Sequence, residues 1–373
     1  GGTAIASGGS LVATGARFSY RDALITTAPV DLDVSRMHQA RQVSHEPILG
    51  EDDRNAVVVT PNILDGTEAP CPFSKRDREF TKNEEFSRAV ALGLFDYMRK
   101  SWSGGFVVSL SGGADSTACA VLIKVMTHLA ILELGEEAFK KKLHYIDFSD
   151  RPVMDRLLTC VYQATRNSGE VTRNAAQTIA DGIGARYQEW DIDAQVEGYK
   201  AIVQKGIGRD LTWETDDLTL QNIQARVRSP GIWMIANIEN ALLLATSNRS
   251  EAAVGYATMD GDTSGGLSPI CGIDKAFLRS WLRWLETDGD AEVAPIPSLK
   301  VVNEQEPTAE LRPADQNQTD EGDLMPYPIL DSIERLAIRD KKLPQECLDF
   351  LVEKYPDYQR DILIGWVKRF FQL

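Results

Sequence analysis

Residues 106–116 constrain the fold of this chain more than any other stretch. They read Phe-Val-Val-Ser-Leu-Ser-Gly-Gly-Ala-Asp-Ser. The apolar, β-rich run at 106–110 predicts a buried strand, the glycines after it predict a tight turn, and the small residues after Asp115 predict a helix. A glycine turn between a strand and a helix directs several backbone N–H groups and the positive helix end at one point. The segment therefore predicts a cradle for phosphate oxygens.

The residues of this turn are the first candidate ligands of a nucleotide. Asp115 repels phosphate unless a cation lies between them, which suggests bound Mg²⁺. The turn is not a Walker A loop, because no Gly-Lys-Ser or Gly-Lys-Thr occurs in the chain. The alternative is an ordinary strand–turn–helix whose small residues serve packing alone. The residues expected at the phosphates are Ser111, Gly112, Gly113, Asp115 and Ser116.

The rest of the chain alternates strands and helices. This alternation predicts an α/β fold with a doubly wound parallel sheet, in which ligands bind beyond the carboxyl ends of the strands. We expect an insertion with one extra helix at 124–156, a mobile loop at 303–326 and a helical tail at 330–373. The expected strands are 106–110, 157–162, 186–192 and 241–245, and the expected helices are 85–102, 171–184 and 218–240.

Composition narrows the class of protein. Of 373 residues, 43% are hydrophobic and 25% charged, as in globular proteins, and no apolar run approaches the roughly 20 residues that cross a bilayer. The net charge of −15 argues against nucleic acid as a partner. Five scattered cysteines without a C-x-x-C pair favour free thiols in a reducing compartment, so we expect a cytoplasmic protein. The N-terminus has no basic start, and we expect no signal peptide.

A second polar segment follows the expected strand at 241–245. It reads Thr-Ser-Asn-Arg-Ser-Glu and carries Glu251 in the first turns of an expected helix. The ends of parallel strands share one edge of a sheet, so Glu251 can face Asp115 and complete a site for a hard cation. The alternative for Glu251 alone is a carboxylate favoured by the helix dipole.

Several strings together resemble the NAD synthetase family, over about residues 80–330 and in the family's order. The first of them resembles the pyrophosphate loop of the N-type ATP pyrophosphatases, which implies their fold and cleavage of ATP between its α and β phosphates. The strings are Ser-Gly-Gly-Ala-Asp-Ser (111–116), Asn-Ile-Gln-Ala-Arg-Val-Arg (222–228), Thr-Ser-Asn-Arg-Ser-Glu (246–251), Gly-Asp (261–262), Ile-Asp-Lys (273–275) and Glu-Pro-Thr-Ala-Glu (306–310).

The resemblance implies roles for single residues. Asp115 and Glu251 match Mg²⁺ ligands, and Thr308 lies on a loop that closes over pyrophosphate, as a further ligand of metal and nucleotide. Lys275 and Asp262 match positions on the deamido-NAD side and complete the expected catalytic set. The arginines and Lys275 can instead be solvated charges, and Thr308 a turn former. The remaining expected nucleotide ligands are Asn222, Arg226, Arg228 and Thr246.

The implied reaction is the ATP-dependent amidation of deamido-NAD to NAD. The nicotinate carboxylate attacks the α-phosphorus of ATP and releases pyrophosphate, and ammonia then attacks the acyl adenylate and releases AMP. Two alternatives stay open. One is another amidoligase of the ATP pyrophosphatase class, similar to GMP or asparagine synthetases, and the other is a catalytically silent nucleotide-binding protein.

The N-terminal part resembles the end of the nitrilase-like glutaminase domain of glutamine-dependent NAD synthetases. Its alternating pattern predicts short strands at 16–20 and 23–32. No cysteine of the chain fits the glutaminase nucleophile, so we expect this chain alone to use ammonia, with an upstream glutaminase domain as a partner. The family also implies a homodimer or larger oligomer. The expected domains are a glutaminase remnant at 1–45, a linker at 46–80, the synthetase domain at 81–330 and a helical extension at 331–373.

Overall fold

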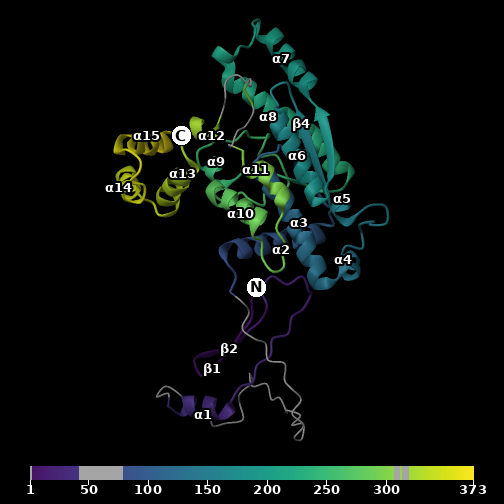
Figure 1. Cartoon of the computed structure of the whole chain (residues 1–373), viewed down its shortest axis with the longest axis vertical. Helices are drawn as coiled ribbons and strands as arrows, with labels where there is room; N and C mark the ends of the chain where they lie inside the picture. Colours follow the sequence, from purple (N-terminus) through teal and green to yellow (C-terminus); the bar gives the residue numbers. More distant parts are fainter. Residues whose placement is uncertain (1, 42–78, 306–310, 313–318) are drawn as a thin grey trace, which may run out of the picture. The chain divides into compact units, whose positions relative to one another are not determined.

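The structure, a computed structural model, describes residues 2–41, 79–305, 311–312 and 319–373 (Figure 1). The chain divides into two compact units, 1–81 and 82–373. The expected linker at 46–80 lies outside the described residues except for its last two. The four described cysteines are free thiols, as expected; they are Cys119, Cys160, Cys271 and Cys347.

The first unit contains an antiparallel hairpin of β1 (Ala4–Ser7) and β2 (Ser10–Thr14), followed by α1 (Leu32–Arg41). Gly8 and Gly9 connect the strands with φ of 56° and 79°, the left-handed values that a tight hairpin turn requires. The strands expected at 16–20 and 23–32 are wrong, because residues 16–31 form no strand. The two-glycine turn placed the hairpin earlier in the chain than the alternating pattern did.

The second unit is built on a parallel sheet of four strands within the described residues, in the order β5-β4-β3-β6. This confirms the predicted α/β fold, and each expected strand lies within one or two residues of an observed one. The strands are β3 (Phe106–Ser109), β4 (Leu158–Ala164), β5 (Arg186–Asp191) and β6 (Leu242–Leu244).

Helices surround this sheet (Figure 1). Their bounds are α2 (Lys82–Ser101), α3 (Ala114–Leu134), α4 (Glu136–Lys142), α5 (Val153–Leu157), α6 (Glu170–Ile183), α7 (Asp193–Ile207), α8 (Trp213–Ile238), α9 (Arg249–Ala253), α10 (Lys275–Thr287), α11 (Lys300–Asn303), α12 (Asp320–Asp323), α13 (Tyr327–Glu334), α14 (Pro344–Lys354) and α15 (Arg360–Gln372), with a 3-10 turn η1 (Pro297–Leu299) and a π turn η3 (Arg335–Arg339).

The strand order decides where a ligand can enter. The chain moves outward from β3 through β4 to β5, with α3 and α6 as crossovers, and then returns through α7 and α8 to β6 on the other side of β3. Because parallel crossovers are right-handed, this reversal puts α8 on the face opposite to α3 and α6. On the α8 face, Val107 and Leu243 of the sheet pack with Ile232 of α8. The loops after β3 and β6 diverge at the reversal, and such switch points are where ligands bind in open α/β sheets.

Two expectations about the middle of the chain are wrong. The insertion expected at 124–156 begins too early, because α3 continues to Leu134, and it holds two short helices, α4 and α5, instead of one. In addition, α3 is long and apolar enough by length and composition to cross a membrane, contrary to the expectation that no run comes close. Of its apolar window, 67% is buried in this structure, and α3 packs against β3, α2 and α6, so a core helix accounts for the composition.

The expected C-terminal helices are confirmed, and they pack against α9 within the second unit. Leu330 and Ile333 of α13 share one buried apolar cluster with Val254 at the end of α9 and with residues of α14 and α15. The expected mobile loop at 303–326 is wrong at its end, since α12 forms there and Asp320 is buried. Residues 306–310 and 313–318 of that loop lie outside the described residues.

Candidate active site

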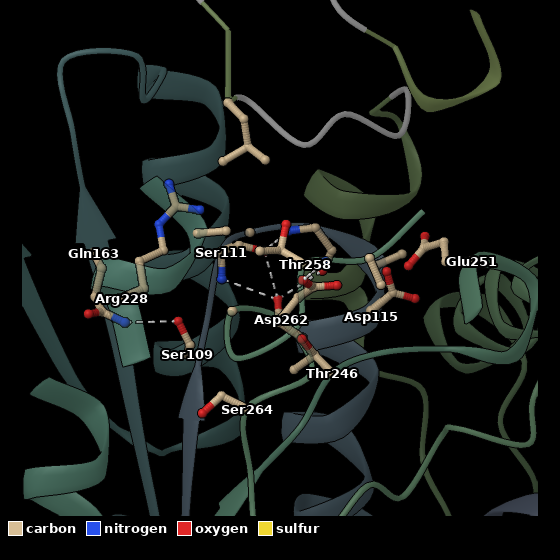
Figure 2. Close-up of a pocket in the computed structure, with 18 of the residues that line it drawn as sticks. Ser109, Ser111, Asp115, Gln163, Arg228, Thr246, Glu251, Thr258, Asp262 and Ser264 are labelled. Carbon is tan, nitrogen blue, oxygen red and sulfur yellow. Dashed lines mark hydrogen bonds between the residues drawn. The ribbon is translucent and has the colours of Figure 1, made fainter. Parts of the chain in front are cut away.

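A cavity of about 310 Å³ lies where the loops after β3 and β6 diverge (Figure 2). It has the size of a small-molecule site. Most of the site residues expected from the sequence line it, which places motifs more than 100 residues apart around one space. These residues are Ser111, Gly112, Gly113, Asp115, Ser116, Asn222, Arg228, Thr246, Glu251, Asp262 and Lys275.

The turn after β3 has the geometry of an anion cradle. Gly112 has φ +82°, and Gly113 begins α3 without any side-chain cap. The first N–H groups of a helix have no partner within the helix, so an uncapped start offers them to a ligand. The hydroxyls of Ser111 and Ser116 lie 3.1 Å apart beside these groups. The local sequence alone therefore builds a cradle that can accept an anion.

A buried ion cluster lies at the start of α3. Lys275 Nζ donates hydrogen bonds to Asp115 Oδ2 and, at 2.8 Å, to Glu251 Oε1. Asn248 Nδ2 donates to Asp115 Oδ1 at 3.0 Å, while Asn248 Oδ1 accepts from the N–H of Glu251 at 3.0 Å. The two carboxylates expected to meet do so, although a lysine lies between them (Figure 2 shows both acids on the same side of the pocket).

Two further residues join this cluster and were missed in the sequence. The hydroxyl of Tyr327 lies 3.1 Å from Glu251 Oε1 and 3.3 Å from Asp320 Oδ2. Oδ1 of Asp320 is buried and has no hydrogen-bond partner among the described residues. Asp320 belongs to the segment expected to be a loop, and Tyr327 lies between that loop and the expected helical tail, so no local pattern marked either of them.

Burial governs the charges in the cluster. Desolvation raises the pKa of Asp115 to about 7 against the attraction of Lys275. Desolvation likewise raises the pKa of Asp320 to about 6. Burial opposes the charge of Lys275, but Asp115 and Glu251 outweigh it and raise the pKa of the ammonium group. One lysine thus faces three acids that are buried or partly buried, and the pocket has an acidic excess that favours a bound cation.

The donor set fits Mg²⁺ in the manner of nucleotide-binding sites. No three His, Cys, Asp or Glu side chains of the described residues converge in metal-binding geometry, so the protein makes no complete cage there. Mg²⁺ is usually held by one or two carboxylates together with phosphate oxygens and waters. Asp115 and Glu251 supply two such carboxylates, and the uncapped turn beside them is where phosphates would lie.

Asp262 and Asn222 shape the wall of the cavity. Asp262 Oδ1 accepts a hydrogen bond from the N–H of Thr258 at 2.7 Å, and its carbonyl accepts from the N–H of Thr246 at 3.2 Å. Asn222 Oδ1 accepts from the hydroxyl of Thr258 at 3.0 Å. Desolvation raises the pKa of Asp262 to about 6. The bonds to Thr258 make both side chains supports of one loop, in addition to any contact they make with a ligand.

The far side of the pocket carries uncharged polar groups and Arg228 (Figure 2). Gln163 Nε2 donates to Ser109 Oγ at 3.0 Å, and neither residue was expected at the site. Both lie near the carboxyl ends of strands that are buried almost throughout, and nothing in the sequence marked them as functional. Arg226 does not line the cavity: it is exposed, and its Nε donates to the carbonyl of Met259. Thr308 lies outside the described residues.

Comparison with known proteins agrees with this architecture. The sequence model of the NAD synthase family matches residues 86–357. The crystal structure of a glutamine-dependent NAD(+) synthetase from Cytophaga hutchinsonii superposes with a TM-score of 0.67 and 44% identity, over 78% of this chain and 48% of that one. The NMN synthetase of Francisella tularensis has a TM-score of 0.52 at 20% identity, over 71% of this chain and 88% of that one, a likeness of fold alone.

Curated relatives agree as well. The glutamine-dependent NAD(+) synthetase of Oryza sativa subsp. indica is 32% identical over 349 residues, which cover 86% of this chain and 47% of that protein. The enzyme of the same name from Rhodobacter capsulatus is 33% identical over 267 residues, 70% of this chain and 42% of its own length. The chain thus spans about half the length of the curated relatives it matches. Since the family model covers most of the second unit, the chain belongs to the NAD synthase family.

Proposed function

We propose that this chain catalyses the ATP-dependent amidation of deamido-NAD to NAD through an acyl adenylate, with release of AMP and pyrophosphate. The observation that carries the proposal is the joining, in one cavity, of the uncapped start of α3 with the buried cluster of Asp115, Lys275 and Glu251. The relatives described above, which are named glutamine-dependent NAD(+) synthetases, support the choice of substrates.

In the proposed mechanism the turn after β3 binds the phosphates of ATP. Backbone N–H groups and the hydroxyls of Ser111 and Ser116 hold phosphate oxygens. Asp115 and Glu251 would hold Mg²⁺, which neutralises charge on the departing pyrophosphate. Lys275 stays protonated because its pKa is raised, so it donates hydrogen bonds and does not act as a base. Catalysis then comes chiefly from positioning and from fixed charges.

The rest of the cavity would hold the dinucleotide and exclude water. The nicotinate carboxylate attacks the α-phosphorus, and ammonia attacks the resulting acyl carbonyl and expels AMP. Water would hydrolyse the acyl adenylate, so a recessed site protects it. The buried acids Glu251 and Asp320, together with the partly buried Asp115, suit a pocket that receives a small cation or ammonia. Asp262 and Arg228 lie farther along the wall, where the dinucleotide would extend.

The source of ammonia is part of the proposal. We infer that residues 1–373 use free ammonium and that glutamine supports the reaction only when a glutaminase domain is supplied. The resemblance of the N-terminal part to the end of such a domain supports this, as does the greater length of the relatives. Cytoplasmic location and a homodimer are further proposals that rest on the free thiols and on the family.

One assay tests the proposal. The chain is incubated with ATP, Mg²⁺ and deamido-NAD, with either ammonium or glutamine, and NAD, AMP and pyrophosphate are measured. We expect all three products in equal amounts with ammonium. Formation of ADP and phosphate would contradict the proposed reaction. Binding of ATP without release of pyrophosphate would also contradict it and would identify a silent nucleotide-binding protein. Turnover with a purine nucleotide or an amino acid in place of deamido-NAD would identify a different amidoligase.

Two variants test the assignment of the carboxylates. Asp115→Asn and Glu251→Gln each remove one charge from the cluster, and we expect NAD formation to fall by about a hundredfold or more. Asp340→Asn, on an exposed carboxylate paired with Arg339, is the control and should retain full activity. Retained activity in both cluster variants would rule out their role in holding the metal and ATP.

A further inference from the structure

The first turn of α10 is held by other helices as well as by its own cap. Asp274 caps the helix in the usual way, by accepting from the N–H of Phe277 at 2.7 Å. The N–H of Lys275 donates to Ser250 Oγ of α9 at 2.8 Å, and the N–H of Ala276 donates to Asp331 Oδ2 of α13 at 3.1 Å. The first N–H groups of α10 are therefore satisfied from two neighbouring helices.

Asp331 links these contacts into one network. Its Oδ1 accepts a hydrogen bond from the hydroxyl of Ser250, and its Oδ2 accepts from the backbone of Ala276. Ser250 and Asp331 are both buried, and neither lines the cavity. A single carboxylate of α13 thus joins the start of α9, which carries Glu251, to the start of α10, which carries Lys275.

The charged side chains of the site depend on this geometry. Glu251 is the residue after Ser250, and Lys275 is the residue before Ala276, so each lies one position from a group bonded to Asp331. Lys275 Nζ must reach Asp115 and Glu251 together to hold the cluster. An ion pair also joins α9 and α13, from Arg249 Nε to Glu334 Oε2 at 3.2 Å, and reinforces the arrangement.

We propose that Asp331 is a positioning residue, which sets the distance between Lys275 and Glu251 by bonding the starts of α9 and α10. This inference rests on the proposed function for its kinetic readout. Asp331 does not touch the cavity, so it acts through Ser250 and through the backbone of α10. Misplacement of a reacting group by about 1 Å can lower a rate on the order of a hundredfold.

The test compares three single variants in residues 1–373, and a double variant that combines Asp331→Asn with Ser250→Ala. Asp331→Asn keeps one acceptor oxygen but cannot accept from both Ser250 and Ala276. Ser250→Ala removes the hydroxyl of α9 that donates to Asp331. Ser332→Ala is the matched control, since Ser332 is a buried neighbour on α13 whose hydroxyl bonds only Pro328, Lys354 and Tyr355 among the described residues. Measurements are kcat and KM for ATP, the melting temperature, and amide hydrogen exchange over residues 272–280.

We expect kcat to fall roughly tenfold or more in Asp331→Asn and in Ser250→Ala, with KM for ATP changed by less than about threefold. The double variant should lose little more than the worse single one, because both changes break one link. Exchange over 272–280 should quicken in Asp331→Asn but not in Ser332→Ala. Ser332→Ala should lower the melting temperature without lowering kcat.

The inference is overturned if Asp331→Asn retains wild-type kcat, or if Ser332→Ala lowers kcat as much. Additive losses in the double variant would also overturn it. If the wild-type chain forms no NAD, the proposed function fails on its own. Hydrogen exchange then tests the role of Asp331 independently of activity. Unchanged exchange over 272–280 in Asp331→Asn would refute the link between Asp331 and α10.

Discussion

Replacing Gly112 by alanine tests the phosphate turn most directly, because it adds a single methyl group. Gly112 has φ +82°, a conformation that side chains rarely adopt. A Cβ atom at this position would lie 2.2 Å from the carbonyl oxygen and 2.9 Å from the carbonyl carbon of Thr172 in α6. Both atoms belong to the backbone, so no side-chain rotation relieves the contact.

The structure allows the cost to be worked out. The left-handed conformation costs alanine roughly 1–2 kcal/mol, and overpacking adds typically about 1–3 kcal/mol. We therefore expect Gly112→Ala to lower the free energy of unfolding by about 2–5 kcal/mol. The contact must lengthen from 2.2 Å to beyond 3.0 Å, and a shift of that order in the phosphate turn should lower kcat/KM for ATP about a hundredfold.

Urea denaturation and steady-state pyrophosphate release measure these two effects. Gly93→Ala is the matched control, since a Cβ at Gly93 within α2 meets nothing within 4 Å. It should raise stability by about 0.5–1 kcal/mol and leave kcat/KM unchanged. If Gly112→Ala behaved like Gly93→Ala in both assays, the close approach of the turn to α6 would be wrong, and so would the cradle built on it.

Three further changes probe the charges of the pocket. Lys275→Met leaves the carboxylates of the cluster without their cation, so the free energy of unfolding in urea should fall by about 3–5 kcal/mol. The exposed control Lys300→Met should change the free energy of unfolding little. Equal stabilities of the two variants would show that the ammonium group of Lys275 is dispensable. Asp262 has a folded pKa of about 6, above its unfolded value, so the folded state binds the extra proton and stability falls as pH rises from about 4 to 6. Asp262→Asn should remove about 2–3 kcal/mol of that fall, and identical pH profiles of unfolding would refute the shift. Asp320→Asn relieves the acidic excess, so the melting temperature of the ligand-free protein should not fall. Calorimetry should show that the affinity for Mg²⁺–ATP is weakened about tenfold. Tighter binding would contradict the proposed attraction of a cation.

Local patterns account for the elements that were predicted correctly. Apolar runs of strand length and helical spacing act within a few residues, so β3, β4, β5 and β6 could be placed within two residues of their ends. The α3 helix was underestimated because an apolar helix buried on most sides has no polar face to mark its length. The N-terminal hairpin was misplaced because alternation after residue 15 outweighed the Gly8-Gly9 turn in the interpretation.

The site residues likewise divide into those that local sequence could reveal and those that only the fold brings together. The turn at 111–116 could be recognised because its cradle is formed by the backbone geometry of consecutive residues. Asp320 and Tyr327 could not, because each acts through partners far away in the chain. Asp331 is a further case, since nothing in the sequence distinguishes it from the other acids of the C-terminal tail or points to α9 and α10.

By itself, the sequence determined the phosphate turn, the order of strands and helices, and the set of acidic and basic residues available to the pocket. Only the tertiary structure decided that one lysine lies between Asp115 and Glu251, and that Asp331 of α13 bonds the starts of α9 and α10, which carry Glu251 and Lys275. The physical reason is the range of the forces involved. Backbone conformation and side-chain periodicity act over a few residues, whereas the meeting of side chains depends on strand order and helix packing across the whole sheet.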